Sequence, residues 1–317
     1  MASVASIGEC MDELSAGDGD NWRMGFAGDT FNLIWALRAL LPDGCPTDFV
    51  SAFGDDPFSD RQRRFMARAG IGTANSPVIA GARPGLYAIT LEAGERSFTY
   101  WRGDAAARRL ADSRQTLDQS LRGRDLIFLS GITLAILDEG PRENLFAALR
   151  LARTGGSRIA FDPNWRPRIW SSESEARLAI TRALGLADIV LPTFSDEATL
   201  FGDATPLATV ARLRRGGVGE IVVKDGPSEA LVASAEGNAS VAALTVKELI
   251  DTTGAGDAFN GGYLAARLRG AAPKEAVRLG HRAAAVVVCR YGALAPHDTM
   301  RTALTADSTS NEFGTVK

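Results

Sequence analysis

The chain has 317 residues, 45% of them hydrophobic and 23% charged, which is the composition of a globular protein and excludes disorder as its main state. Its 35 Lys and Arg residues against 38 Asp and Glu leave a net charge of −3, the wrong sign for binding nucleic acid or an anionic membrane, so a small-molecule partner is expected. The three widely spaced cysteines, an N-terminus without a signal-peptide pattern and no apolar run near the roughly 20 residues of a bilayer span predict a cytoplasmic protein without disulfides.

Apolar runs typical of strands alternate along the chain with stretches that have apolar residues at helical spacing. The predicted strands are residues 2–7, 48–53, 125–130, 158–161, 189–191 and 220–223. The predicted helices are residues 58–69, 142–154, 173–186, 207–215, 258–269 and 273–291, the last ending near Gly292. This alternation predicts an α/β fold, with a parallel sheet covered by helices on both faces.

Two segments do not follow this alternation. Residues 10–26 are polar and Gly-rich, and residues 84–103 alternate as a β-hairpin does, with turn residues at 92–95. Together they predict a small antiparallel β lid inserted in the α/β body. We therefore expect a single domain over residues 1–306, followed by a flexible polar tail at 307–317.

The segment with the strongest chemical signal is a Gly-rich turn that leads into a helix of small residues, DTTGAGDAFNGGYL at 251–264. Successive glycines allow backbone N–H groups to converge at a helix N-terminus, where the partial positive charge favours a phosphate group. No GK[ST] follows, so the turn is not a Walker A loop, and its glycine spacing does not match a dinucleotide fingerprint. Asp257 is then either an ordinary first-turn carboxylate or the base that accepts a proton from an attacking hydroxyl.

This segment resembles the C-terminal signature of the PfkB, or ribokinase-like, carbohydrate kinases, and the resemblance extends over nearly the whole chain. It implies a ribokinase-like three-layer α/β/α, Rossmann-like body with a small β-sheet lid, and the use of ATP and Mg²⁺. It also implies that Asp257 is the catalytic base and that the amides of Gly254, Ala255 and Gly256 neutralise charge on the transferred phosphoryl group.

Six further segments resemble one branch of the family, the 2-keto-3-deoxygluconate kinases (2-dehydro-3-deoxygluconokinases). They are IGECMDEL at 7–14, FAGDTFN at 26–32, PGLY at 84–87, YWR at 100–102, SGIT at 130–133 and FDPNWRPRIW at 161–170. The resemblance implies a substrate site with sugar-hydroxyl ligands, lid-side residues and two arginines for the substrate carboxylate. In that order these are Gly28, Asp29 and Asn32, then Tyr87 and Tyr100, then Arg102 and Arg166, with Ile132 and Asp257 in the same site.

A guanidinium fork suits a sugar-acid carboxylate, because it binds that group in a fixed orientation. Arg166 follows a predicted parallel strand, where ligand crevices form, whereas Arg102 could equally be a solvated lid arginine and Arg168 a structural or phosphate-facing one. The alternatives for the other residues are also open. The two tyrosines could cover the inner face of the hairpin, and Asp29 could cap a helix.

The nucleotide side carries weaker signals. VVKDG at 222–226 resembles the family's strand-then-Gly segment near ATP, which implies that Lys224 and Gly226 face the nucleotide, although a solvated strand-end lysine is an equal alternative. Ala284 and Val288 fall on the helix that borders the adenine in relatives, but plain core packing gives the same spacing. His281 is given no catalytic role.

One departure from the family pattern concerns Mg²⁺. Relatives carry an Asn-x-x-Glu motif that organises the ion through water, but here the segment reads LPTFSDEA at 191–198. Glu197 is the preferred candidate, in water-mediated contact, while alignment on Pro192 would instead place Thr193 and Asp196 at the two motif positions.

The predicted reaction is ATP-dependent phosphorylation of the 6-hydroxyl of 2-keto-3-deoxygluconate. The alternatives are a fructokinase-like PfkB enzyme and a non-catalytic sugar-acid sensor on the same fold. The gluco or galacto preference, a monovalent-cation requirement and assembly into a homo-oligomer are left open.

Overall fold

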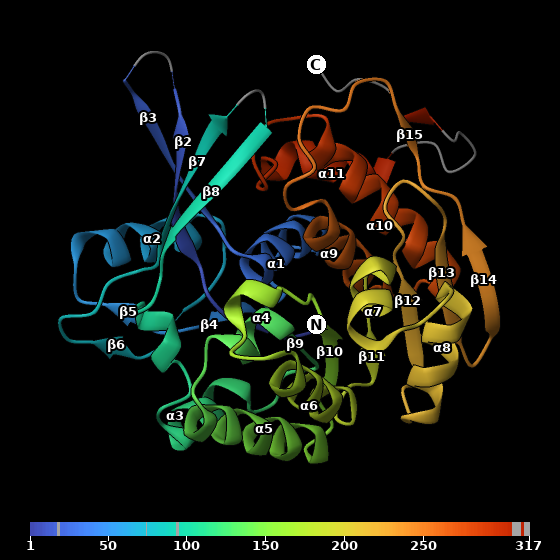
Figure 1. Ribbon diagram of the computed structural model, residues 1–317, viewed down its shortest axis with the longest axis horizontal. Helices are drawn as coiled ribbons and strands as arrows, with labels where there is room; N and C mark the ends of the chain where they lie inside the picture. Colours follow the sequence, from blue (N-terminus) through green and yellow to red (C-terminus); the bar gives the residue numbers. More distant parts are fainter. Residues whose placement is uncertain (18–19, 74, 93–94, 306–311, 314–317) are drawn as a thin grey trace.

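The structure is a computed structural model that describes residues 1–17, 20–73, 75–92, 95–305 and 312–313, and it is built around an eight-stranded sheet (Figure 1). The strand order is β14-β13-β12-β11-β10-β9-β1-β4. In that order the strands are Gly237–Val241, Ala230–Ser234, Glu220–Val223, Ile189–Val190, Arg158–Asp162, Leu126–Ser130, Val4–Ile7 and Thr47–Val50.

The six strands from β12 to β4 run parallel, as predicted, whereas β13 and β14 add to the edge as an antiparallel pair. No predicted strand corresponds to this pair, and because of it the sheet is mixed rather than parallel throughout. The predicted strand at 48–53 is also divided, because β4 ends at Val50 and Phe53–Gly54 (β5) pairs with Val78–Ile79 (β6) instead.

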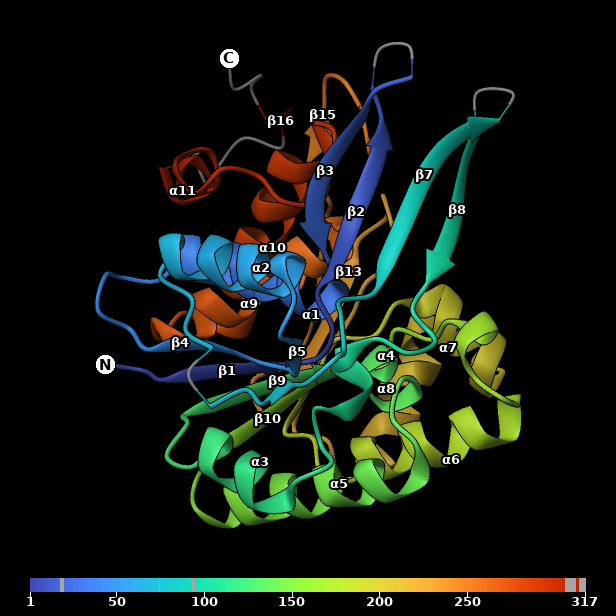
Figure 2. The same ribbon diagram turned by 90° about the vertical axis from the view of Figure 1, so that its left-hand side faces the viewer.

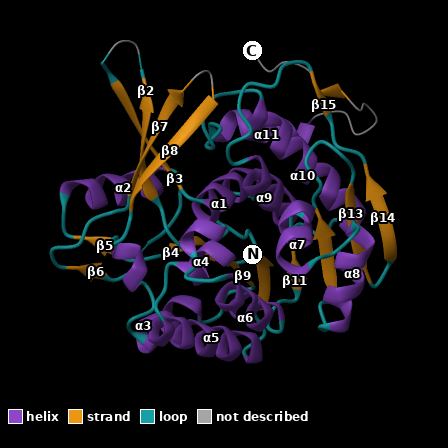
Figure 3. Ribbon diagram, in the orientation of Figure 1, coloured by secondary structure: helices purple, strands orange, loops and turns teal. Residues whose placement is uncertain are grey.

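Helices cover both faces of the sheet, and successive strand residues face opposite cores. Leu126 and Phe128 lie in one core and Ile127 and Leu129 in the other, as the two-residue period of a strand requires. The first core is closed by α1 (Asp29–Leu40), α9 (Ala255–Leu268), α10 (Pro273–Val288) and α11 (His297–Thr305). The second is closed by α3 (Arg114–Leu121), α5 (Glu139–Thr154), α6 (Glu173–Leu184) and α8 (Pro206–Arg215), so the body has the three layers that were predicted (Figure 3).

The predicted lid is present as a four-stranded sheet that projects from the body beside α2 (Pro57–Arg68), as Figure 2 shows. Its order is β3-β2-β7-β8, with strands Trp22–Ala27, Met11–Ala16, Leu86–Glu92 and Glu95–Trp101. The two hairpins are antiparallel, but β2 and β7 join them in parallel, so the lid is mixed and not antiparallel as expected. The turn predicted at 92–95 includes residues 93–94, which lie outside the described residues.

All six predicted helices are observed within a few residues of the predicted bounds, and the local sequence explains where they begin and end. α2 begins after Asp56, whose carboxylate accepts from the Phe58 amide at 2.8 Å, and α10 begins on Pro273 as expected. α10 stops at Val288, earlier than predicted, and Gly292 lies in the turns that follow it.

Two residues of the predicted tail at 307–317 are described. Glu312–Phe313 (β16) pairs in parallel with Thr245–Val246 (β15), and the rest of the tail lies outside the described part of the chain.

Among the helices in the ranges described above, none combines the length and apolar character needed to cross a bilayer.

Candidate active site

A cavity of about 800 Å³ lies where the lid, the ends of the parallel strands and the first turns of α1 and α9 meet. It collects all of the residues predicted for base, anion hole and substrate, although they come from all parts of the chain. The predicted residues that line it are Gly28, Asp29, Asn32, Tyr87, Tyr100, Arg102, Ile132, Arg166, Lys224, Gly254, Ala255, Gly256 and Asp257.

The Gly-rich turn forms the N-terminus of α9, as its sequence predicts. Gly254 is the N-cap with φ of 75°, and a Cβ there would come within 2.5 Å of the Ala293 Cβ, so both conformation and space require glycine. Gly256 has no positive φ, and a Cβ there would only touch the Lys224 ammonium at 3.8 Å. Asp257 is therefore a first-turn residue and a cavity residue at once, and the two interpretations of it are compatible.

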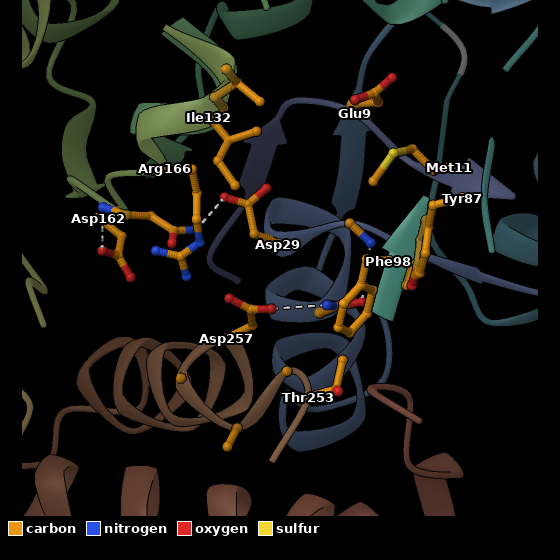
Figure 4. A pocket seen from close by; sticks show the side chains of 18 of the residues that line it. Glu9, Met11, Asp29, Tyr87, Phe98, Ile132, Asp162, Arg166, Thr253 and Asp257 are labelled. Atoms are coloured by element: carbon orange, nitrogen blue, oxygen red, sulfur yellow. Dashed lines mark hydrogen bonds between the residues drawn. The ribbon is translucent and has the colours of Figure 1, made fainter. Parts of the chain in front are cut away.

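The surroundings of Asp257 suit a base that works near neutral pH. Asn32 Nδ2 donates to Asp257 Oδ2 at 2.8 Å, drawn as a dashed line in Figure 4. Burial in the cavity wall, assisted by the nearby Asp29 carboxylate, raises the pKa of Asp257 from its usual 3.8 to about 7, against the opposing effect of the Asn32 hydrogen bond. A carboxylate with this pKa is matched to accepting a proton from a hydroxyl at pH 7.

The first turn of α1 forms the neighbouring wall. Gly28 is the N-cap, and a Cβ on it would lie 2.0 Å from the Glu9 carbonyl oxygen, so the close approach of these backbones requires glycine. Asp29 is the first helical residue rather than the cap, and its Oδ2 accepts from Asn164 Nδ2 at 2.7 Å. Figure 4 shows Asp29, Asp257 and Arg166 pointing into the same space.

The lid contributes aromatic rings to the cavity. Tyr87 is buried and its hydroxyl donates to Glu13, whereas Tyr100 is half exposed, with the two ring centroids 5.6 Å apart. Phe98 lies beside them and also lines the cavity. The tyrosines thus cover the inner face of the hairpin and line the site at the same time.

Both predicted carboxylate-binding arginines reach the cavity, and each already has an acidic partner. Arg102 is largely buried and forms an ion pair with Glu9, so the interpretation as a solvated lid arginine is wrong. Arg166 is half exposed, and its Nη1 donates to Asp196 Oδ2 at 3.2 Å. Arg168 also lines the cavity. Three arginines therefore line the cavity, and arginine is the side chain suited to binding an anionic ligand there.

Lys224 is not a solvated strand-end lysine. It is 8% exposed and lines the cavity, and its ammonium donates to Asp162 Oδ2 at 2.7 Å and to Asn260 Oδ1 at 3.0 Å. Four residues of the site were not predicted: Asp162, Asn164, Asn260 and Glu9. The available signal for the first two was their place directly at and after the end of a parallel strand, in FDPNW.

The remaining nucleotide-side predictions fall outside this cavity. Gly226 forms a turn with φ of 55° after β12, while Ala284 and Val288 are partly buried on α10. None of the three is among the residues that line the cavity. Their contact with ATP stays a prediction.

The geometry does not support Glu197 as the Mg²⁺ residue. Its carboxylate is buried away from the cavity and forms an ion pair with Arg212, which also binds Asp203 at 2.7 Å. The segment turns Glu197 inward because it lies one residue further round α7 (Phe194–Phe201) than Asp196, which contacts Arg166 instead. Thr193 lines the cavity, so the alignment on Pro192 fits the structure better. The described residues contain no cluster of three or more Asp, Glu, His or Cys side chains that could hold a metal ion by themselves.

Comparison with known proteins agrees with this site. Residues 1–300 match the model of the pfkB family carbohydrate kinases. The chain is 39% identical over 306 residues to a 2-dehydro-3-deoxygluconokinase of Dickeya dadantii, covering 94% of this chain and 98% of the relative. It is 38% identical over 304 residues to the enzyme of the same name from Escherichia coli K12, with the same coverage.

Solved structures with ligands share the fold. A putative ribokinase II of E. coli in complex with ATP and Mg²⁺ has a TM-score of 0.83 and 26% identity, over 97% of this chain and 100% of that one. A fructokinase double mutant of Vibrio cholerae, bound to fructose, ADP and a potassium ion, has a TM-score of 0.82 and 25% identity, over 94% and 95% of the two chains. The fold and the site are those of a ribokinase-like sugar kinase. The α/β/α body and its β lid enclose Asp257, the Gly-rich turn and the basic side chains of the cavity. The chain belongs to the pfkB family of carbohydrate kinases and is an ATP-dependent sugar kinase.

Proposed function

We propose that this kinase phosphorylates the 6-hydroxyl of 2-keto-3-deoxygluconate and releases ADP and the 6-phosphate. The observation that carries the choice of substrate is the pair Arg102 and Arg166, which lines the same cavity as Asp257 and the Gly-rich turn. A sugar acid brings one carboxylate that such a pair can bind, and a neutral sugar has no need of it. The 38–39% identity to enzymes named for this substrate supports the same choice.

In the proposed reaction Asp257 accepts the proton of the 6-hydroxyl as its oxygen forms a bond to the γ-phosphorus of ATP. The bond from that phosphorus to the ADP oxygen breaks, and ADP leaves with its electron pair. The backbone amides at Gly254–Gly256 stabilise the charge on the transferred group, since they lie at the positive end of α9. In the structure the Ala255 N–H donates to the Thr252 carbonyl at 3.2 Å, so it must exchange that bond for the phosphate. Gly28, Asp29 and Asn32 hold the sugar hydroxyls beside the base.

Mg²⁺ fits this site as an ion carried by the nucleotide. The described residues supply isolated oxygen donors rather than a closed cage. A water-mediated contact would come from Thr193, which lines the cavity, or from Asp196, the ion-pair partner of the cavity residue Arg166. When bound, the ion would neutralise part of the phosphate charge.

An ADP-release assay with purified protein tests the substrate. We expect turnover of 2-keto-3-deoxygluconate well above that of fructose or ribose, and the galacto epimer measured beside it sets the stereochemical preference. Comparable turnover of fructose would remove the sugar-acid assignment, and fructokinases do occur among the relatives, with 32% identity to one from rice over 74% of this chain. Repeating the assay without K⁺ tests the monovalent-cation requirement.

The variant Asp257→Asn tests the base. The amide is nearly isosteric, so calorimetry should still detect binding of sugar acid and ATP, while kcat falls by roughly 10² to 10⁴, the usual contribution of a general base. A variant that keeps more than about a tenth of wild-type kcat would exclude Asp257 as base. Wild-type protein that binds the sugar acid but releases no ADP would instead be a sensor.

A further inference from the structure

Asp162, the last residue of β10, forms a closed hydrogen-bonded triangle with Lys224 and Asn260. Its Oδ2 accepts from Lys224 Nζ and from Asn260 Nδ2, both at 2.7 Å, and the ammonium also donates to Asn260 Oδ1 at 3.0 Å. All three side chains are buried, and they come from β10, the residue after β12, and α9. The triangle joins the carboxyl ends of β10 and β12, which lie on either side of β11, to α9, the helix that carries Asp257.

The triangle is next to the Gly-rich turn. Lys224 Nζ lies 3.8 Å from the position that a Cβ on Gly256 would take, and Asn260 is one helical turn beyond that glycine. Lys224 and Asp162 both line the cavity. An ammonium has three N–H donors, and the two bonds named here leave one for an anion at the turn.

The other oxygen of Asp162 is linked through Asn164 to Asp29. Asp162 Oδ1 accepts from the backbone N–H of Asn164 at 3.0 Å, and the side-chain Nδ2 of Asn164 donates to Asp29 Oδ2 at 2.7 Å. Asn164 has φ of 33°, the left-handed conformation that costs a non-glycine residue free energy and is kept where surrounding contacts hold it. One carboxylate thus binds Lys224 and Asn260 through Oδ2 and, through Oδ1, the backbone of Asn164, whose side chain binds Asp29.

A purely structural ion pair explains this arrangement less well. Burying a lysine and a carboxylate together is about as stable as packing apolar side chains there, or less so, because both charges lose their water. An ion pair that lines a cavity can instead hold its cation where negative charge develops during a reaction. A cation fixed in this way stabilises a phosphoryl group during its transfer.

We propose that Asp162 is a positioning residue that, with Asn260, aims Lys224 at the transferred phosphoryl group and, through Asn164, holds Asp29 at the sugar. This inference rests on the kinase reaction proposed above and adds to it residues that the reaction did not assign. Lys224 acts as a hydrogen-bond donor and transfers no proton. The bond changes are those already described, with the hydroxyl proton going to Asp257.

The opposite charges of Asp162 and Lys224 predict opposite shifts in the pKa of Asp257 when each is removed. The groups that influence the pKa of Asp257 are the carboxylates of Asp29 and Asp162, which raise it, and Lys224 and the Asn32 amide, which lower it. Replacing Asp162 by a neutral residue should lower the pKa of Asp257, and replacing Lys224 should raise it. The acid limb of kcat/KM, where activity is lost as the base is protonated, should move to lower pH in the first case and to higher pH in the second.

The experiment compares Asp162→Asn and Lys224→Met with wild type, using pH profiles of kcat/KM for 2-keto-3-deoxygluconate at saturating MgATP. Substrate ionisations are common to all proteins and cancel in the comparison. The matched control is Asp203→Asn, because Asp203 is an equally buried partner of an arginine outside the cavity. We expect kcat to fall about 10²- to 10³-fold in Lys224→Met, as for removal of one transition-state donor, and about 10-fold or more in Asp162→Asn, with the two limb shifts of opposite sign. The control should keep wild-type kcat and limb position.

Three outcomes would overturn the proposal. The first is an acid limb of kcat/KM that stays in place in both Asp162→Asn and Lys224→Met, and the second is a limb that moves in the same direction in both. The third is a higher KM for ATP in Lys224→Met with unchanged kcat, which would make the lysine a ground-state nucleotide ligand. If a melting curve shows that Asp162→Asn is unfolded, Asn260→Ser takes its place, since it removes one partner of Lys224 without a change of charge, and an unchanged kcat there counts against the proposal. The variant Asp257→Asn, measured in parallel, distinguishes a failure of the proposed reaction from a failure of the role proposed for Asp162. An active Asp257→Asn contradicts the proposed base, whereas an inactive one with unmoved limbs in the other variants contradicts only the role of Asp162.

Discussion

Asn32 on α1 donates a hydrogen bond from Nδ2 to Oδ2 of Asp257 on α9 at 2.8 Å, across 225 positions of sequence. The other end of the same amide accepts from the Gly28 backbone N–H at 3.3 Å. The side chain that the family resemblance assigns to the sugar therefore also orients the base. The two roles are compatible, because an amide nitrogen has a second hydrogen to donate.

Replacing Asn32 by Ala should move the acid limb of kcat/KM to higher pH. The wild-type limb is expected near pH 7, where Asp257 takes up its proton, and the Asn32 bond favours the charged carboxylate and so lowers that pKa. Loss of a hydrogen bond to a charged group, about 1.5–3 kcal/mol, should reduce kcat/KM by roughly 10- to 100-fold below the limb. Asn144→Ala is the control, since that amide donates to the Ala111 carbonyl on α5's side of the body. An unmoved limb would show that Asn32 does not orient the base.

Gly254 and Gly256 should respond differently to Ala. Gly254→Ala forces a side chain into a positive φ and against Ala293, so its melting temperature should fall clearly. Gly256→Ala meets no such obstacle and should fold normally, yet its methyl group would stand beside the Lys224 ammonium where phosphate must approach, so kcat should drop. Melting curves and steady-state rates for both variants check this. Equal loss of stability in the two would show that Gly256 is needed for folding.

Arg166→Lys should weaken the sugar acid alone. The substitution keeps the charge but loses the planar fork, and losing one charge-assisted hydrogen bond of about 1.5–3 kcal/mol should raise KM for 2-keto-3-deoxygluconate about 10- to 100-fold. KM for ATP should barely change, whereas an arginine on the γ-phosphate would chiefly lower kcat. Arg153→Lys, in an exposed pair with Asp188, serves as control. Wild-type KM for the sugar acid in Arg166→Lys would place the substrate carboxylate elsewhere.

Arg102 should matter for stability as well as for binding. Arg102→Met leaves the buried Glu9 carboxylate without its partner, and breaking such a pair costs about 3–5 kcal/mol of unfolding free energy. Burial already raises the pKa of Glu9, so part of this loss should disappear at low pH, where Glu9 is neutral. The double variant Glu9→Gln/Arg102→Met should recover much of the stability in denaturant titrations. Strictly additive effects would mean that the two side chains do not interact.

The short-range features of this protein follow from its sequence. The alternation of β and α segments, the lid hairpins, the glycine turn of α9 and the candidate base are all local patterns, because a strand, a turn or a helix end depends on residues within a few positions of one another. The family resemblance adds the reaction class, and the pfkB match and the relatives confirm it. The strands β13 and β14 were not predicted. They form a hairpin, but its place at the edge of the main sheet depends on the pairing of β13 with β12.

What only the tertiary structure decided is which side chains share an environment. Nothing local distinguishes Glu197 from Asp196, yet one residue of helix rotation turns the first toward Arg212 and the second toward Arg166. Lys224 is one of many cations in the sequence until Asp162 and Asn260, distant along the chain, enclose it beside Gly256. The pKa of Asp257 and the acidic partner of each arginine depend on burial and on charges a few ångströms away. Packing sets both, rather than the neighbours in the sequence.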